Sequence, residues 1–125
     1  MNITKSLFLF TLFTFINCIT IREESKVVRK GTTIEISHSC ETPRKLIYQS
    51  YWSVIINKNK KDIYSFIDNI EKIHDNRYKF IKCGLIIENI QLNDTGIYEH
   101  RNYYYNNDKS AIIGVINLFD MKVIE

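Results

Sequence analysis

Residues 85–98 read LIIENIQLNDTGIY and hold the pattern that decides the fold. Leu85 and Ile87 are two positions apart, the spacing at which a β-strand points side chains to one side, and Ile90 would fill the turn beneath them. Asp94 and Gly96 suit a tight corner after that strand. Tyr98 opens the next segment. The stretch therefore predicts two strands joined by a short corner.

The rest of the chain also favours strands, because β-branched and aromatic residues recur with a period of two. Strands are expected over residues 33–40, 49–56, 63–67, 80–88, 98–104 and 111–123. A charged turn is expected at 57–62, and residues 70–75 fit either a helical turn or a short strand. Short strands separated by polar turns indicate an all-β, antiparallel sandwich.

The N-terminus has the layout of a secretory signal peptide. Lys5 precedes an uncharged, largely apolar run, LFLFTLFTFI at residues 7–16, and the charged chain begins at Arg22. The run is shorter than a membrane span. We expect residues 1–20 to be removed and residues 21–125 to form a single secreted domain without a membrane anchor. Losing Lys5 would lower the formal net charge from +3 to +2.

The composition gives no sign of catalysis or of nucleic-acid binding. The net charge of +3 is mild, and lysines are scattered among acidic residues. The sequence has no Gly-rich phosphate loop, no HExxH motif and no Ser–His–Asp spacing. We therefore expect a non-enzymatic protein with no cofactor, no metal and no nucleic-acid partner. Asn93-Asp94-Thr95 is a glycosylation sequon, which makes Asn93 a candidate glycan site in an exposed turn.

These features together resemble the immunoglobulin superfamily, in its V-type or a shortened relative. The resemblance covers nearly all of residues 21–125 and implies an immunoglobulin-like antiparallel β-sandwich with a buried core tryptophan. It also implies a tyrosine corner, in which the Tyr98 ring is buried and its hydroxyl bonds back to the upstream backbone. The residues that carry it, in order and spacing, are Gly31, Trp52, Leu85, Asp94, Gly96 and Tyr98.

The same resemblance places the two core cysteines of such domains at His38 and His100, so the usual disulfide between the sheets would be absent. If Cys18 leaves with the leader, Cys40 and Cys83 remain, an even pair in a secreted chain. In the immunoglobulin arrangement their strands are antiparallel neighbours. The resemblance therefore implies a Cys40–Cys83 disulfide within one sheet.

His38 and His100 would then face each other across the sandwich. One hypothesis is a metal site or an acid-sensitive switch. Two imidazoles are too few ligands for a zinc site, and no free cysteine remains to complete one. We favour the other hypothesis, in which two neutral, hydrogen-bonded imidazoles fill the space of the missing disulfide.

A tyrosine-rich stretch follows His100, at the position of the third antigen-contacting loop of variable domains. Tyrosine supplies a large amphipathic contact area, and asparagine supplies adaptable hydrogen bonds. The alternative is that some of these tyrosines are ordinary strand residues. The candidate partner-binding residues are Tyr103, Tyr104, Tyr105, Asn106 and Asn107. A second candidate surface consists of Tyr48, Tyr51 and Tyr64.

The leader, the atypical immunoglobulin-like domain and the Asn-, Lys- and Ile-rich chain are similar to the small secreted immunoglobulin-like proteins of poxviruses. The resemblance implies a viral immunomodulator that binds a host extracellular protein, either a cytokine or an immune-cell receptor, and it does not name the ligand. The other hypothesis is a non-enzymatic glycoprotein module of the secretory pathway that acts through self-association or assembly. The sequence leaves the oligomeric state open.

Overall fold

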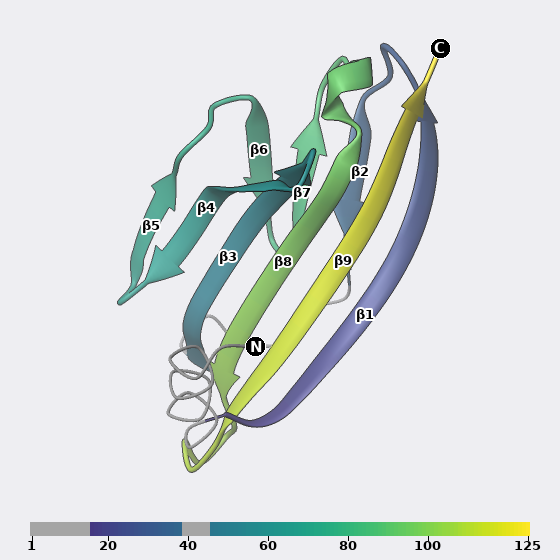
Figure 1. Cartoon of the computed structure of the whole chain (residues 1–125). Helices are drawn as coiled ribbons and strands as arrows, with labels where there is room; N and C mark the ends of the chain where they lie inside the picture. Colours follow the sequence, from purple (N-terminus) through teal and green to yellow (C-terminus); the bar gives the residue numbers. More distant parts are fainter. Residues whose placement is uncertain (1–15, 39–45) are drawn as a thin grey trace.

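The computed structural model describes residues 16–38 and 46–125, and these residues form two β-sheets packed face to face (Figure 1). The large sheet has the strand order β1-β9-β8-β3-β4-β5, and the small sheet has the order β2-β7-β6. The strands are β1 (Ile16–Arg29), β2 (Ile34–Ser37), β3 (Ile47–Ile56), β4 (Asn59–Ile67), β5 (Ile70–Ile73), β6 (Tyr78–Ile81), β7 (Gly84–Ile87), β8 (Gly96–Tyr105) and β9 (Ile112–Ile124). The all-β, two-sheet architecture predicted from the sequence is confirmed.

Neighbouring strands are antiparallel with one exception, since β1 runs parallel to β9 along the edge of the large sheet. The β3–β4 hairpin turns through Asn57 and Lys58, with φ angles of 50° and 64°. Two central residues with positive φ are the signature of the turn that matches the twist of antiparallel strands. A charged, exposed turn therefore connects the two strands.

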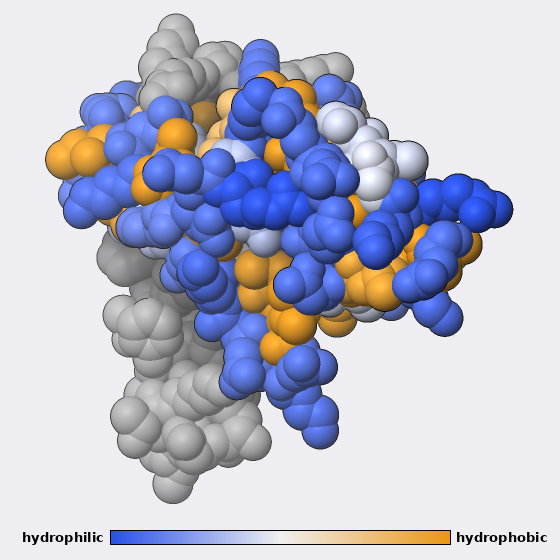
Figure 2. Space-filling model, turned by 90° about the horizontal axis from the view of Figure 1, so that it is seen from above, coloured by the Kyte–Doolittle hydropathy of each residue, from blue (hydrophilic) through white to orange (hydrophobic). Residues whose placement is uncertain are grey.

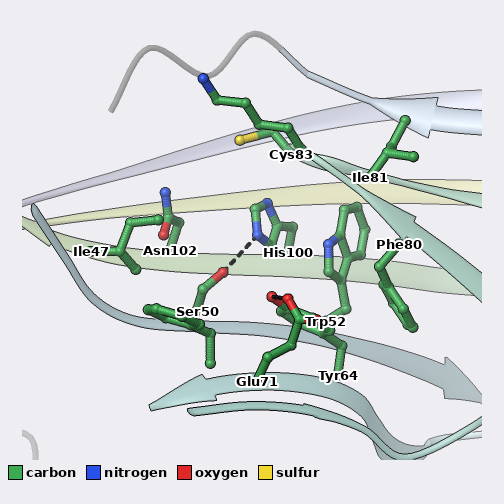
Figure 3. Close-up of a pocket in the computed structure, with 12 residues that line it drawn as sticks. Ile47, Ser50, Trp52, Tyr64, Glu71, Phe80, Ile81, Cys83, His100 and Asn102 are labelled. Carbon is green, nitrogen blue, oxygen red and sulfur yellow. Dashed lines mark hydrogen bonds between the residues drawn. The ribbon is translucent and has the colours of Figure 1, made fainter. Parts of the chain in front are cut away.

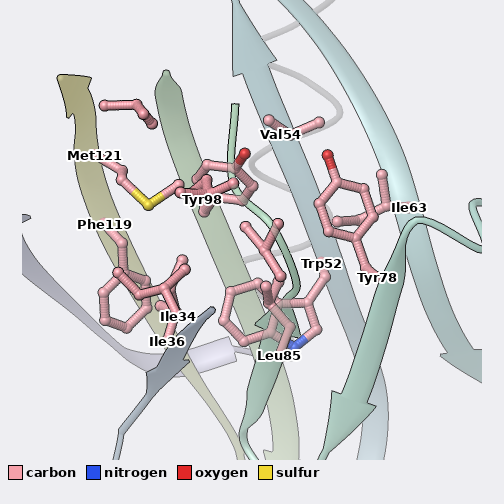
Figure 4. Packing of buried hydrophobic residues seen from close by; sticks show 13 residues of the cluster. Ile34, Ile36, Trp52, Val54, Ile63, Tyr78, Leu85, Tyr98, Phe119 and Met121 are labelled. Atoms are coloured by element: carbon pink, nitrogen blue, oxygen red, sulfur yellow. The ribbon is translucent and has the colours of Figure 1, made fainter. Parts of the chain in front are cut away.

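The inner faces of the two sheets bury one hydrophobic core (Figure 4). Trp52 from β3 and Tyr98 from β8 are its largest fully buried side chains, and Leu85 from β7 packs against them from the small sheet. The alternation of side chains explains which residues belong to the core, because residues two apart on a strand point to the same face. The remaining members are Ile34, Ile36, Val54, Ile63, Tyr78, Ile87, Ile90, Phe119, Met121 and Val123.

The corner between β7 and β8 is fixed by hydrogen bonds, as its sequence predicts. It contains the 3₁₀ turn η2 (Leu92–Asp94), and the Tyr98 hydroxyl donates to the Asp94 carbonyl oxygen at 2.8 Å. The Asp94 carboxylate accepts a hydrogen bond from the Gln91 backbone N–H and one from the Arg77 guanidinium, each at 2.7 Å. A Cβ at Gly96 would lie 2.7 Å from the Ile55 carbonyl oxygen, so only glycine lets β8 approach β3 here.

Several segments differ from the sequence-based expectation. Residues 80–88, expected as one strand, form parts of the β6–β7 hairpin, whose turn places Cys83 at a φ of 54°. The expected turn at 57–62 is shorter, because β4 already starts at Asn59, and the undecided segment 70–75 contributes strand β5. The pairing of β1 with β9 was not expected, and β1 begins at Ile16, inside the predicted leader. Cleavage of that leader stays a prediction.

No helix within the described residues has the length and apolar character needed to cross a membrane.

The corner bond makes a testable contribution to stability. Tyr98→Phe removes a buried hydroxyl that bonds the backbone and leaves the Asp94 carbonyl without that donor, so the free energy of unfolding should fall by about 1–2 kcal/mol. Urea denaturation measures it. Tyr64→Phe removes an exposed hydroxyl bond to Glu71 and is the matched control, with an expected change below about 0.5 kcal/mol. Equal effects of the two variants would contradict this account of the corner.

Candidate functional site

Two histidines join the sheets at the position where the resemblance puts the missing disulfide. His38 follows β2, and its backbone N–H donates to the Cys83 carbonyl oxygen at 3.1 Å. His100 projects inward from β8, and its Nδ1 lies 2.5 Å from Nε2 of His38. The other ring nitrogen of His100, Nε2, lies 3.0 Å from the Ser50 hydroxyl oxygen (Figure 3). The structure thus brings together the two histidines singled out in the sequence.

The His100 ring is held in a low-dielectric environment. Its side chain is stacked on the Trp52 indole, with ring centroids 4.5 Å apart and an interplanar angle of 8°, and only 3% of the residue is exposed. Burial, assisted by the neighbouring His38, lowers the pKa of His100 to about 3. A neutral imidazole carries one N–H and one lone pair, which matches its two hydrogen-bond partners. The geometry is that of a packed imidazole pair in which His100 is uncharged.

The described residues contain no group of three His, Cys, Asp or Glu side chains placed to hold a metal ion. Cys83 is disulfide-bonded in this structure. Its predicted partner Cys40 lies outside the described residues, so the Cys40–Cys83 pairing stays a prediction.

The outer face of the large sheet carries a second cluster. Along β8 the inward side chains Tyr98, His100 and Asn102 alternate with partly exposed outward ones, and Arg101 and Tyr103 belong to the outward set. The Arg101 guanidinium carbon lies 4.6 Å from the ring centroid of Tyr51, a cation–π arrangement.

Tyr103 extends this cluster toward the edge of the sheet. Two of its ring carbons lie 3.1 Å from where a Cβ on Gly114 would be, so the ring lies against the glycine of β9. On the other side of Gly114, Cγ1 of Ile19 in β1 lies 3.5 Å from the same point. We call the surface formed by Ile19, Ile21, Tyr51, Arg101 and Tyr103 the tyrosine face.

Ion pairs hold Arg101 in place within the tyrosine face. Its Nε lies 3.0 Å from the Glu99 carboxylate, and one of its terminal nitrogens lies 3.6 Å from Asp62. Lys60 also contacts Glu99, at 2.8 Å. Burial raises the pKa of the Tyr51 hydroxyl, with Arg101 acting in the opposite direction, so this phenol is a neutral hydrogen-bonding group. The face therefore combines fixed aromatic surface with one positioned cation.

The structure separates the residues predicted to form one binding loop. Tyr103, Tyr104 and Tyr105 are the last residues of β8, and the loop proper begins at Asn106. Tyr103 joins the tyrosine face, and Tyr105 packs edge-on against Tyr48 at 5.5 Å. Asn107 lies exposed in the loop.

Asn106 is engaged inside its own loop, where its side chain accepts a hydrogen bond from the Ala111 N–H and donates one to the Ser110 hydroxyl. Its backbone also bonds to Ala111 and Lys109. These contacts give Asn106 a structural role in shaping the loop.

The second candidate surface is divided in the same way. Tyr51 belongs to the tyrosine face, whereas Tyr64 packs against Phe80 of the small sheet with centroids 4.8 Å apart. Arg101 and Ile19 were missed in the sequence. The alternation of Glu99, Arg101 and Tyr103 around buried His100 would have indicated Arg101, but nothing local indicated that β1 lies beside β9.

The predicted glycan site is accessible in the folded chain. Asn93 is exposed in η2, while the adjacent Asp94 is buried in the corner. The Thr95 hydroxyl oxygen accepts the Val123 N–H at 3.0 Å. Whether the sequon is used stays a prediction.

Comparison with known proteins identifies the fold. No family model and no curated protein sequence matches the chain. Among solved structures, murine CRIg has a TM-score of 0.66 at 15% sequence identity, covering 82% of this chain and 93% of that one. The two sheets and this similarity establish an immunoglobulin-like β-sandwich.

Two further similar structures have TM-scores of 0.59 and 12% identity. One is a chain from a study of T cell specificity and activation by the superantigen toxic shock syndrome toxin-1, covering 80% of this chain and 92% of that one. The other is from a study of multimeric cell-adhesive interactions of VGSC beta subunits, covering 82% and 92%. At these identities the similarity concerns the fold.

The buried imidazole makes stability depend on pH. The pKa of His100 is about 3 in the folded chain and near the ordinary value of 6.5 when unfolded, so the unfolded state binds the proton more readily. This contribution to stability is complete above about pH 6.5 and is lost as pH falls toward 3, at roughly 1.4 kcal/mol per unit.

Urea denaturation at pH 7 and pH 5 should therefore differ by about 2 kcal/mol from this group alone. His100→Leu should flatten the pH dependence, whatever its effect on stability at pH 7. The control variant His74→Gln, at an exposed position, should show the same change in the free energy of unfolding between pH 7 and pH 5 as the wild type. An unchanged slope in His100→Leu would contradict the buried neutral imidazole.

Proposed function

We propose that this chain is a secreted recognition domain that binds another extracellular protein through the tyrosine face. The observation that carries the proposal is the arrangement of Tyr51, Arg101 and Tyr103 on the outer face of the large sheet, beside Ile19 and Ile21. Tyrosine and arginine are the residue types most enriched among those that dominate binding energy at protein interfaces.

The cluster is suited to binding because little of it has to become ordered. Arg101 is held between the Tyr51 ring and the carboxylates of Glu99 and Asp62, and the Tyr103 ring rests on Gly114. Immobilising flexible side chains at an interface costs affinity, so a preformed cluster retains more of its contact energy. Ile21, which is 61% exposed, adds apolar area at the rim.

The proposed partner is a host cytokine or immune-cell receptor, and the proposed origin is viral. This part of the proposal rests on the resemblance to small secreted poxvirus proteins. Two of the similar structures concern T cell activation by a superantigen and cell-adhesive interactions, so the same fold supports protein recognition elsewhere. Catalysis has no part in the proposal.

Secretion and glycosylation fit this use of the surface. Asn93 lies in η2, at the end of the sandwich opposite the β8–β9 turn (Figure 1). Seen from above, that end is covered largely by hydrophilic side chains, with hydrophobic areas between them (Figure 2). A glycan there would leave the β8–β9 end of the tyrosine face uncovered.

A second candidate function is assembly, favoured by the edge of the large sheet. Among the described residues β1 has a neighbouring strand on one side only, and its residue Val27 is 64% exposed. A long edge strand with exposed apolar residues can pair with another strand. The resulting module would act by self-association.

The proposal is tested with protein collected from the medium of expressing human cells. Intact mass before and after glycosidase treatment reports leader removal and use of Asn93. The purified chain is then screened against an array of human cytokines and receptor ectodomains. For a binder found, Tyr51→Ala and Tyr103→Ala should each weaken affinity at least tenfold, about 1.4 kcal/mol.

Leu92→Ala, an exposed apolar residue in η2, is the matched control and should leave affinity unchanged. Thermal unfolding of each variant excludes loss of the fold. A binder insensitive to both tyrosine substitutions would contradict the tyrosine face. A stable oligomer by light scattering, without any binder, would favour assembly.

A further inference from the structure

The inner face of the large sheet is polar at one end. Ser50, His100, Asn102 and Asn117 lie there with 7%, 3%, 5% and 4% of their surfaces exposed. They are neighbours across three strands, because Ser50 pairs with Asn102 and His100 pairs with Asn117 in the strand register. Buried polar side chains grouped in this way are unusual in a sandwich core and need hydrogen-bond partners.

A pocket of about 430 Å³ opens over this polar patch, between the two sheets (Figure 3). Its walls include the aromatic rings of Trp52, Phe66 and Phe80, and Ile81 of β6 lies across from Asn102 and His100. The volume falls within the range of sites that bind small organic molecules, and an apolar wall with a few convergent polar groups is their usual composition.

One polar atom in the pocket lacks a partner. Oδ1 of Asn102 is buried and accepts no hydrogen bond from any residue in 16–38 or 46–125. Ser50 and His100 at the floor are bonded to each other, whereas Nδ2 of Asn117, in the same polar patch, also has no hydrogen-bond partner among the described residues. A buried amide oxygen without a partner calls for a hydrogen-bond donor, and a ligand in the pocket can supply one.

The chemistry of the floor restricts the ligand. His100 and Ser50 at the floor are uncharged, and the two charged residues that line the pocket, Glu71 and Lys82, are exposed. A charged group at the floor would therefore lose its hydration without an ionic partner there. A flat or alicyclic body would fill the space between the aromatic side chains. A hydroxyl or N–H group on that body would supply the missing donor.

We propose that this pocket binds a small, neutral molecule with an aromatic or alicyclic body and one hydroxyl or N–H group that donates to Oδ1 of Asn102. The site lies on the inner face of the large sheet and is separate from the tyrosine face on the outer side. It is therefore independent of the proposed protein partner. An ordered water bonded to Asn102 is the competing explanation of the same geometry.

The test compares two probes that differ only in a hydroxyl group, 2-naphthol and naphthalene. Each is titrated into the ¹⁵N-labelled protein, and the signals of the Trp52 indole N–H and the Asn102 side-chain amide are followed by NMR. Trp52 is the only tryptophan of the chain, which makes its signal unambiguous. We expect both signals to shift, with 2-naphthol binding about tenfold more tightly than naphthalene.

Two variants assign the binding to this pocket. Asn102→Leu removes the acceptor and retains the side-chain size, so the two probes should then bind with equal affinity. Ile81→Phe adds bulk at a wall residue that is 40% exposed, so both probes should bind more weakly. Ile73→Phe, on an exposed position of β5 outside the pocket, is the control and should behave as the wild type.

Preference for 2-naphthol that disappears in Asn102→Leu would support the site. Failure of both probes to bind the wild type would overturn it and leave a hydrated pocket. Equal affinity of the two probes for the wild type, or binding that persists unchanged in Ile81→Phe, would also overturn it. None of these outcomes depends on a protein partner.

Discussion

The contact between His38 and His100, with the His100 ring stacked on Trp52, is the polar interaction that joins the two sheets beside their hydrophobic core. It joins the small sheet to the large one at the place where the resemblance puts a disulfide, and it does so with hydrogen bonds instead of a covalent bond. A hydrogen bond between two imidazole rings requires one ring nitrogen to carry a proton and the other to offer a lone pair. We therefore expect the sandwich to be sensitive to acid at a point where a disulfide would not be. It has also acquired buried polar groups, and the pocket lies beside them.

Strand β8 shows how one segment serves both the core and the surface. Its inward residues Tyr98, His100 and Asn102 provide the corner, the inter-sheet contact and the floor of the pocket. Its outward residues Arg101 and Tyr103 provide the tyrosine face. Because successive side chains of a strand point to opposite faces, the inward and outward sets have different chemistry although they share one backbone. A rigid inner set also limits the movement of the outer set, which favours a preformed binding surface.

The sequence was sufficient where a local pattern determines a contact. Asp94, Gly96 and Tyr98 predicted the corner, because each has a backbone role that few other residues can fill. Pairings distant in sequence were harder to predict. The parallel pairing of β1 with β9 depends on tertiary structure alone. Cys83 adopts a left-handed backbone conformation in the β6–β7 turn, and cysteine is not a residue type that predicts a turn. The tyrosines after His100 were identified as contact candidates, but their distribution between two faces required the register of β8.

The most direct test of this account is the protonation state of His100 in the folded chain. NMR of the ¹⁵N-labelled imidazole rings, recorded from pH 7 to pH 4, distinguishes neutral from charged rings and detects their mutual contact. We predict that the His100 ring stays neutral and in contact with His38 for as long as the protein remains folded. A His100 ring that becomes protonated near pH 6.5 without unfolding, or two rings without contact, would contradict the central claim.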